Sequence, residues 1–164
     1  MDFLEQYYNL ETLGLGELCF RFFLAIAFGF VIGFDRDVKD KPIDFRAYMI
    51  VCVATCVTAL IGQELFVTYS NSNIGTGVDM GKIVSGVMTG IGFLGAGAII
   101  HSGDTKIIGT ATGASIWASG AMGLAIGFGL YVLSFICFLS LLLILVVGGW
   151  WMKPAIGRKD NGEF

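Results

Sequence analysis

The chain has 164 residues, of which 55% are hydrophobic and only 14% are charged, and its mean hydropathy is +0.79. This composition excludes an ordinary soluble domain and indicates a polytopic membrane protein. The net charge of −3 and the lack of a long basic run exclude nucleic acid as a partner, because neutralising phosphates requires clustered Lys and Arg.

The N-terminal third predicts an interfacial segment followed by two membrane spans. Residues 1–16 are polar and aromatic, which is typical of a membrane interface. Residues 17–34 suffice for about one bilayer crossing, and Arg21 lies one turn inside it. Arg21 forms either a local ion pair with Glu17 or a buried cation that faces the helix bundle. A second span is expected at about 47–66.

The loop between these two spans, residues 35–46, is the most charged segment, with four acidic and four basic side chains. Asp35 and Arg36 end the first span, and Arg46 begins the second. These three side chains suggest a polar network that locks the helices or contacts a partner. The alternative is simple anchoring at the membrane edge.

The same loop contains the only candidates for a metal site, and they are weak. Magnesium needs one or two carboxylates in octahedral geometry with retained waters. Asp35, Asp37 and Asp40 supply enough oxygen atoms, but basic residues alternate with them and offset their charge. A solvated loop is the alternative to a cation sensor.

Three further spans are predicted in the second half of the chain. Asp79 can cap the third span, which leads to a short polar hinge at residues 101–106. Residues 107–152 carry no Asp, Glu, Lys or Arg, and one helix over them would be about 69 Å long, more than twice the membrane thickness. The chain therefore turns near Gly127, which gives spans at about 107–126 and 129–151. Two tryptophans and Pro154 are expected to end the last span.

Small residues recur every four positions in these spans, which favours close helix packing inside a bilayer. Gly86 and Gly90 show this spacing, as do Ser115, Ser119 and Gly123. Their hydroxyl-bearing neighbours either bond across helix interfaces or line a polar path. The helix-packing or path-lining candidates are Gly86, Thr89, Gly90, Gly92, Gly95, Gly97, Thr112, Ser115, Trp117, Ser119 and Gly123.

The distribution of basic residues predicts the orientation. Eight Lys and Arg residues fall on one side of the five spans, and only Arg21 and Lys82 lie toward the other. By the positive-inside rule the N-terminus is outside and the C-terminus is cytoplasmic. We thus expect an all-α membrane protein with an interfacial segment at 1–16, a transmembrane domain at 17–152 and a cytoplasmic tail at 153–164.

The residues indicate no enzyme and no cofactor. His101 lies beside Ser102 and near Asp104, but adjacent residues on a short loop cannot provide the geometry of a catalytic triad. Cys52 and Cys56 share a helix face without a neighbouring His or carboxylate, so they are expected to be small core residues.

Several motifs resemble the membrane domain of the bacterial MgtC/SapB family over roughly residues 17–151. They are Gly33-Phe34-Asp35-Arg36, Asp44-Phe45-Arg46-Ala47, Asp79-Met80-Gly81-Lys82, Gly90-Ile91-Gly92-Phe93-Leu94-Gly95-Ala96-Gly97, Thr112 through Trp117, and Gly123-Leu124-Ala125-Ile126-Gly127. The chain departs from the family pattern at Asp35 (usually Glu), Lys82 (usually Arg) and Gly86 (commonly Gln). We expect no counterpart of the cytoplasmic regulatory domain that follows the membrane part in some members.

The resemblance implies a plasma-membrane protein linked to low-magnesium adaptation and, in pathogens, to survival inside macrophages. It implies a regulator that restrains the F-type ATP synthase or influences ion homeostasis, and it makes a homo-oligomer, a dimer above all, plausible. An ion or small-solute transporter is the alternative. The residues expected in the polar network or in partner contacts are Arg21, Asp35, Arg36, Arg46, Asp79 and Lys82.

Overall fold

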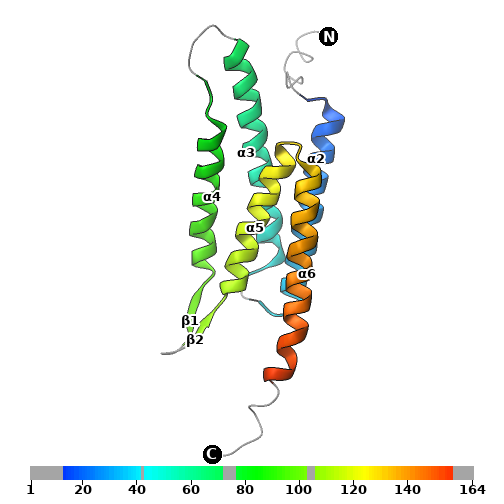
Figure 1. The fold of residues 1–164 in the computed structure, drawn as a ribbon, viewed down its shortest axis with the longest axis vertical. Coiled ribbons are helices and arrows are strands. Elements are labelled where there is room, and N and C mark those ends of the chain that lie inside the picture. The colour runs from blue at the N-terminus through cyan, green and yellow to red at the C-terminus, as the bar shows by residue number, and fades with distance from the viewer. Residues whose placement is uncertain (1–12, 42, 72–76, 103–105, 157–164) are drawn as a thin grey trace, which may run out of the picture.

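The computed structural model describes residues 13–41, 43–71, 77–102 and 106–156, which form a bundle of five long helices with a short β-hairpin (Figure 1). The elements are α2 (Leu15–Asp37), α3 (Phe45–Asn71), α4 (Met80–Gly97), β1 (Ile100–Ser102), β2 (Lys106–Ile108), α5 (Thr110–Gly127) and α6 (Tyr131–Ile156). The expectation of an all-α polytopic membrane protein is confirmed. The ends of the bundle are named below after Arg21, near the start of α2, and Arg36, near its end.

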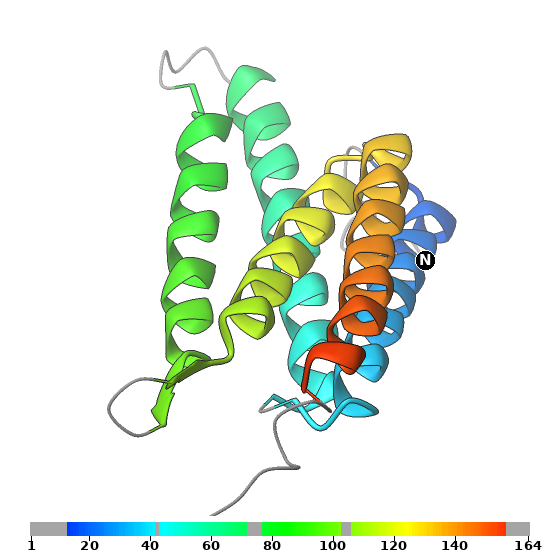
Figure 2. The same cartoon turned by 60° about the horizontal axis from the view of Figure 1, so that its bottom comes forward.

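Four of the helices, α2, α3, α4 and α6, are long and apolar enough to cross a membrane. The helix α5 lies between them, with α4 on one side and α2 and α6 on the other (Figure 2). More than half of its residues are buried. A helix that is mostly covered by other helices presents little surface to lipid, which explains how α5 can be rich in Gly, Ala, Ser and Thr and still lie within the bundle.

Glycines set the distance between α2 and α3. A Cβ atom added at Gly29 would lie 2.7 Å from the Cα of Met49, and one added at Gly33 would lie 2.6 Å from the carbonyl oxygen of Phe45. Real Cβ atoms do not approach backbone so closely. The two helices therefore cross with their backbones in contact.

The same kind of contact fixes α5. A Cβ atom at Gly113 would lie 2.5 Å from the carbonyl oxygen of Gly95 on α4. On the α3 side, Gly123 lies against Thr55 and the Cys52 carbonyl, and a Cβ atom at Gly127 would lie 2.5 Å from the Cys56 carbonyl oxygen. The predicted small-residue face of this span is thus an inward-facing surface.

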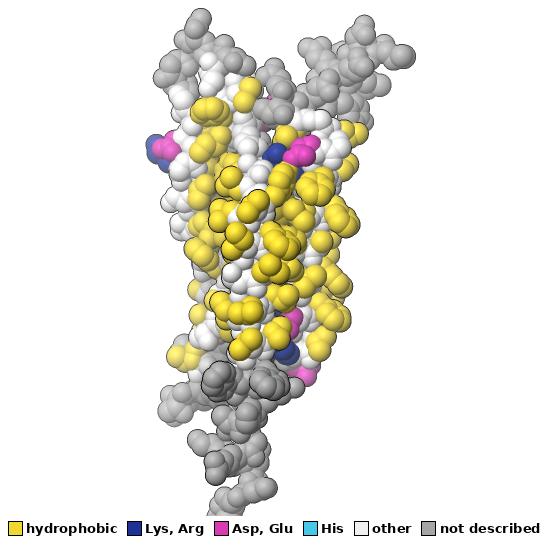
Figure 3. Space-filling view, turned by 45° about the vertical axis from the view of Figure 1, so that its right-hand side comes forward, with side chains coloured by type: hydrophobic (Ala, Val, Ile, Leu, Met, Phe, Trp, Pro, Cys, Tyr) yellow, Lys and Arg dark blue, Asp and Glu magenta, His cyan; other side chains and the backbone are white. Residues whose placement is uncertain are grey.

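The outer surface is apolar along its middle. Figure 3 shows hydrophobic side chains over the centre of one face and charged side chains near its two ends. The helix α6 has the highest hydropathy of the spans, 2.8, and only 11% of its span window is buried. Such a surface suits contact with lipid acyl chains.

The hinge and the helix ends differ in detail from the prediction. The described part of the hinge, residues 101, 102 and 106, belongs to two antiparallel strands in which Ile100 pairs with Ile108. The fourth helix therefore begins at Thr110 and not at 107. The turn near Gly127 is confirmed: Gly129 has φ +77°, and the amide of Leu130 donates to the carbonyl of Ala125 at 2.8 Å. The last helix continues past Pro154, since a proline in a final turn removes only one helical hydrogen bond.

Two predicted regions lie outside the described residues. These are positions 1–12 of the interfacial segment and positions 157–164 of the C-terminal tail.

Candidate functional site

Polar side chains gather at both ends of the bundle, and the cluster at one end is centred on Arg21. We call Arg21, Glu17, Gln63, Gly127 and Tyr131 the Arg21 cluster. Its members come from α2, α3, the last residue of α5 and the first residue of α6. The short turn between α5 and α6 brings Gly127 and Tyr131 onto Arg21, so four helices meet there.

Arg21 is buried, with 7% of its surface exposed. Its Nε atom lies 3.0 Å from a Glu17 carboxylate oxygen and donates to the Tyr131 hydroxyl at 2.9 Å. One terminal nitrogen donates to the Gln63 side chain at 3.3 Å and to the Gly127 carbonyl at 2.5 Å. The Tyr131 hydroxyl in turn donates to Glu17. Both alternatives from the sequence are therefore true, because Arg21 forms a local ion pair and also faces the bundle.

A cavity of about 790 Å³ adjoins the Arg21 cluster. Arg21, Gln63 and Ser85 are its polar wall, and the rest of the wall is mostly apolar. The lining residues are Leu13, Arg21, Gln63, Phe66, Val67, Met80, Gly81, Val84, Ser85 and Phe128. The cavity thus lies between α3 and α4 at the end where the chain enters α2 and α4.

The opposite end holds a second buried arginine. We call Arg36, Tyr48 and Thr112 the Arg36 cluster; they come from α2, α3 and α5. All three residues are buried, and a terminal nitrogen of Arg36 donates to the Thr112 hydroxyl at 3.2 Å. The Arg36 Nε atom and the Tyr48 hydroxyl are buried without a hydrogen-bond partner among the described residues.

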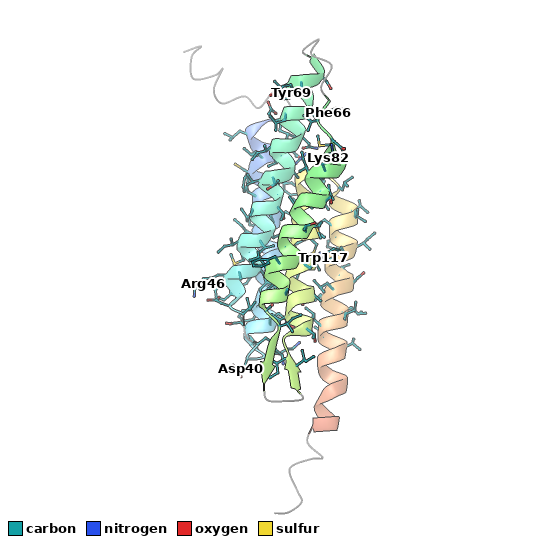
Figure 4. The ribbon with its side chains drawn as sticks, turned by 90° about the vertical axis from the view of Figure 1, so that its left-hand side faces the viewer. Asp40, Arg46, Phe66, Tyr69, Lys82 and Trp117 are labelled. Carbon is teal, nitrogen blue, oxygen red and sulfur yellow. The ribbon has the colours of Figure 1, made fainter. Side chains whose placement is uncertain are left out.

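The predicted network of Asp35, Arg36 and Arg46 does not form as expected. Asp35 turns toward α6, where it accepts from Lys39 at 2.7 Å, and Lys39 also donates to the Leu145 carbonyl at 3.2 Å. Arg46 is exposed and pairs with Asp44, away from the bundle (Figure 4). Successive residues of a helix point in different directions. Asp35 and Arg36 are neighbours in α2, but their side chains therefore contact different parts of the bundle.

The pair of Asp44 and Arg46 is a surface feature. The Arg46 side chain donates to Asp44 at 2.6 Å, and the Arg46 backbone amide donates to the same carboxylate at 2.9 Å. These hydrogen bonds hold the pKa of Asp44 below its usual value of 3.8. The pair thus fixes the loop just before α3.

Asp79 and Lys82 lie at the start of α4, at the Arg21 end. Asp79 is the predicted N-cap of this helix, and its side chain accepts from the Lys82 amide at 3.2 Å. The Lys82 side chain is exposed and visible near that end in Figure 4. The six predicted contact residues thus belong to both ends of the molecule.

The predicted small residues divide into an inward and an outward group. Gly95, Thr112, Ser115, Ser119 and Gly123 are buried. Gly86, Thr89, Gly90 and Gly97 are exposed, Gly92 has no atom within 4 Å of an added Cβ, and Trp117 is half exposed beside α4 (Figure 4). The glycines of the outward group meet no other helix within the described part of the chain, because α4 touches the bundle along only one face. Their role in helix packing or path lining stays a prediction.

The hydroxyls of α5 do not face an open path. Ser115 donates to the Ala111 carbonyl at 2.6 Å, and Ser119 donates to the Ser115 carbonyl at 2.9 Å. On α4, Thr89 bonds likewise to the Ser85 carbonyl at 2.8 Å. These groups are satisfied by their own helices, as small hydroxyls in membrane helices often are.

No three His, Cys, Asp or Glu side chains within the described ranges are grouped so that they could hold a metal. Asp35, Asp37 and Asp40 therefore do not converge on one point. The side chains of His101 and Ser102, and Asp104 as a whole, lie outside the described set. Cys52 and Cys56 are fully buried core residues, as predicted.

Sequence reasoning missed Tyr131 and Tyr48 as site residues. Tyr131 follows Arg21 by 110 positions, and no local spacing connects the two. Tyr48 carries a weak signal, because a tyrosine hydroxyl inside an apolar span needs a partner. Gln63 was visible as a polar residue near the end of the second span, but its partner was not.

Comparison with known proteins gives one family. The sequence model of the MgtC family matches residues 22–153. The chain is 38% identical to an uncharacterized protein of Haemophilus influenzae over 65% of this chain and 44% of that protein. It is 31% identical to Protein SapB of Bacillus subtilis, over 75% of this chain and 51% of that protein.

A third relative is the protein of Escherichia coli K12 named "Putative magnesium transporter YhiD". It is 32% identical over 75% of this chain and 56% of its own length. The chain thus spans about half the length of the curated relatives that it matches. No solved structure matches the chain.

Proposed function

Because the chain belongs to the MgtC family, we propose that it is a non-enzymatic regulator in a bacterial plasma membrane. It acts in magnesium-linked ion homeostasis through contacts with other membrane proteins, without conducting ions itself. The name of the Escherichia coli relative supports the link to magnesium. The observation that carries the proposal is the tightly closed packing around α5.

A conducting path between the glycine-rich helices would need space and free polar groups. The backbones of Gly95 and Gly113 leave no room for an added Cβ between α4 and α5. Ser115 and Ser119 use their hydroxyls on their own helix. Both observations therefore favour a packed interior over a pore.

The outward face of α4 supports a role in contacts. Gly86, Gly90 and Gly97 have open space where a Cβ would be, and only 11% of the span window of this helix is buried. Such a face allows another helix to approach closely in a bilayer. Its occupants in this proposal are a second copy of the chain, as a dimer, or another membrane complex such as the F-type ATP synthase.

The proposal includes an orientation. The Arg36 end is cytoplasmic, together with the C-terminus, and the Arg21 end is outside. The excess of basic residues on the Arg36 side supports it.

One observation favours the alternative function, a transporter. The cavity of about 790 Å³ beside Arg21 combines an apolar wall with a cation and an amide, as binding sites for small solutes do. A transporter would use this cavity as its entry site and would need to open the packing around α5.

Flux measurements on reconstituted protein distinguish the two functions. The purified protein is placed in liposomes, and magnesium, proton and anion fluxes are compared with those of empty vesicles. An Arg21→Ala variant tests the buried cluster, and Arg46→Ala is the control for loss of an exposed charge. We expect flux no higher than in empty vesicles. Flux that Arg21→Ala abolishes and Arg46→Ala retains would establish the transporter instead.

A further inference from the structure

The Arg36 cluster combines an unmatched positive charge with almost complete burial. Arg36 is 5% exposed, Thr112 is 1% exposed and Tyr48 is fully buried. An isolated buried charge is costly, particularly within a membrane protein, and usually has a counter-ion. The role of the Arg36 cluster therefore depends on which groups surround the guanidinium.

No carboxylate in the described part of the chain pairs with Arg36. Three carboxylates there pair with other bases: Glu17 with Arg21, Asp35 through one oxygen with Lys39, and Asp44 with Arg46. The second oxygen of Asp35 is buried without a hydrogen-bond partner among the described residues. Within the described ranges, the side chain of Arg36 donates one hydrogen bond of ordinary geometry, to the neutral hydroxyl of Thr112, and the Tyr48 hydroxyl is its other polar neighbour. Its Nε atom is left without an acceptor.

The guanidinium does not serve as a cap for α2 either. Backbone amides that follow the helix already occupy its last carbonyls: Val38 donates to Phe34 at 3.0 Å, and Lys39 and Lys41 both donate to Arg36 at 3.2 Å. The Arg36 side chain instead crosses to α5. The reason for the position of the Arg36 side chain must therefore lie at the start of α5.

The Tyr48 hydroxyl provides a second, independent sign of a missing acceptor. It lies close to the polar groups of Arg36 and Thr112, but it forms no hydrogen bond of ordinary geometry with any described residue. Buried tyrosine hydroxyls normally find a partner. Two unused donors, Arg36 Nε and Tyr48 O–H, thus come together from different helices.

The start of α5 adds a third source of positive potential. Gly109 is the N-cap and makes no side-chain cap hydrogen bond, and the first helical hydrogen bond is donated by Gly113. The amides of the three residues between them therefore remain available, and the helix dipole places partial positive charge there. Helix N-termini with such free amides bind anions.

We propose that the Arg36 cluster and the N-terminus of α5 bind a phosphate-type oxyanion. The guanidinium, the Tyr48 hydroxyl and the first amides of α5 offer donors to several oxygens at once, which suits a phosphate group better than a single-atom anion. Arg36 lies in the last turn of α2, at one end of a candidate membrane span. The phosphate therefore comes from a free ion or from an anionic headgroup, and this site is separate from the proposed regulatory contacts of α4.

The test measures thermal unfolding of the purified protein in delipidated detergent solution. Sodium gluconate is replaced stepwise by inorganic phosphate, or in a parallel series by chloride, at constant ionic strength and without magnesium. Arg36→Gln removes the central donor, and Tyr48→Phe removes one hydroxyl with little change of shape. Arg46→Gln and Tyr131→Phe are the matched controls, since each makes the same chemical change outside the site.

We expect phosphate, but not chloride, to raise the unfolding temperature saturably in the native protein and in both controls. Tyr48→Phe should weaken the apparent affinity roughly tenfold, and Arg36→Gln about a hundredfold or more. Tyr48→Phe keeps the proposal testable if Arg36→Gln does not fold.

A second series identifies the source of the phosphate. The native protein and Tyr48→Phe are compared in nanodiscs of phosphatidylglycerol and of phosphatidylcholine. Stabilisation by phosphatidylglycerol alone that Tyr48→Phe reduces, with no response to free phosphate, would assign the site to a lipid headgroup. The proposal is wrong if neither phosphate source distinguishes the native protein from Tyr48→Phe, or if chloride acts as well as phosphate.

Discussion

Replacing Gly123 by alanine should destabilise the bundle, whereas the same replacement at Gly90 should not. An added Cβ at Gly123 would overlap the Thr55 hydroxyl and the Cys52 carbonyl oxygen, and would lie 2.9 Å from the Cys52 carbonyl carbon. At Gly90 no atom lies within 4 Å of the added Cβ. Both positions are inside helices, so the change in helix propensity is shared and the difference reports packing.

The magnitude follows from two opposing effects. Alanine favours a helix over glycine by about 1 kcal/mol. Overpacking a tight core costs about 1–3 kcal/mol, and a clash with a backbone carbonyl, which cannot rotate away, belongs at the upper end of that range. Gly123→Ala should therefore lower the free energy of unfolding by about 2 kcal/mol, and Gly90→Ala should raise it by up to about 1 kcal/mol.

The measurement is reversible unfolding in mixed micelles with increasing dodecyl sulfate, followed by circular dichroism and tryptophan fluorescence. The two variants should differ by about 3 kcal/mol, the sum of these effects. A Gly123→Ala variant at least as stable as the native protein would refute the assignment of Gly123 to the α3–α5 contact. A Gly90→Ala variant that unfolds as easily as Gly123→Ala would show that α4 packs by its outward face in the isolated protein.

Three further predictions concern the ends of the bundle. Tyr131→Phe removes the hydroxyl that accepts from Arg21 and donates to Glu17, and should lower the free energy of unfolding by about 1 kcal/mol in the same assay; an unchanged stability would contradict the Arg21 cluster. A fluorescent protein fused to the C-terminus should fluoresce in cells and a fused alkaline phosphatase should be inactive, whereas the opposite pattern would reverse the orientation. Because the folded-state pKa of Asp44 is lowered by Arg46, its contribution to stability is present above the ordinary pKa of 3.8 and is lost as the pH falls through the folded value. Asp44→Asn should therefore show a shallower loss of stability with acid, and a slope equal to that of the native protein would contradict this.

The sequence predicted the helices well, because a membrane span needs both length and hydropathy. The span that hydropathy marks least clearly, α5, was found from the long uncharged stretch that had to turn back at Gly127. Its buried face also followed from the spacing of Ser115, Ser119 and Gly123. The same spacing at Gly86 and Gly90 stays a prediction of close helix contact, since small residues permit such a contact but do not say whether the partner is in the same chain.

The candidate site was predictable only where its contacts are local. The pair of Glu17 and Arg21 follows from their spacing along one helix turn. The partners of Arg21 from α5 and α6 and the meeting of Arg36 with Tyr48 depend on how separate helices pack and rotate. Those contacts required the three-dimensional structure.

The position of α5 has a consequence for how the protein is made. Insertion machinery recognises a nascent span largely by its hydropathy, and α5 is the described helix that is not apolar enough to count as a candidate span. The hairpin joins it closely to α4, and the turn at Gly129 joins it closely to α6. We therefore expect α4, α5 and α6 to enter the bilayer as one unit during synthesis. A chain that ends at Gly127 should therefore leave α5 on the aqueous side, because α6 is missing.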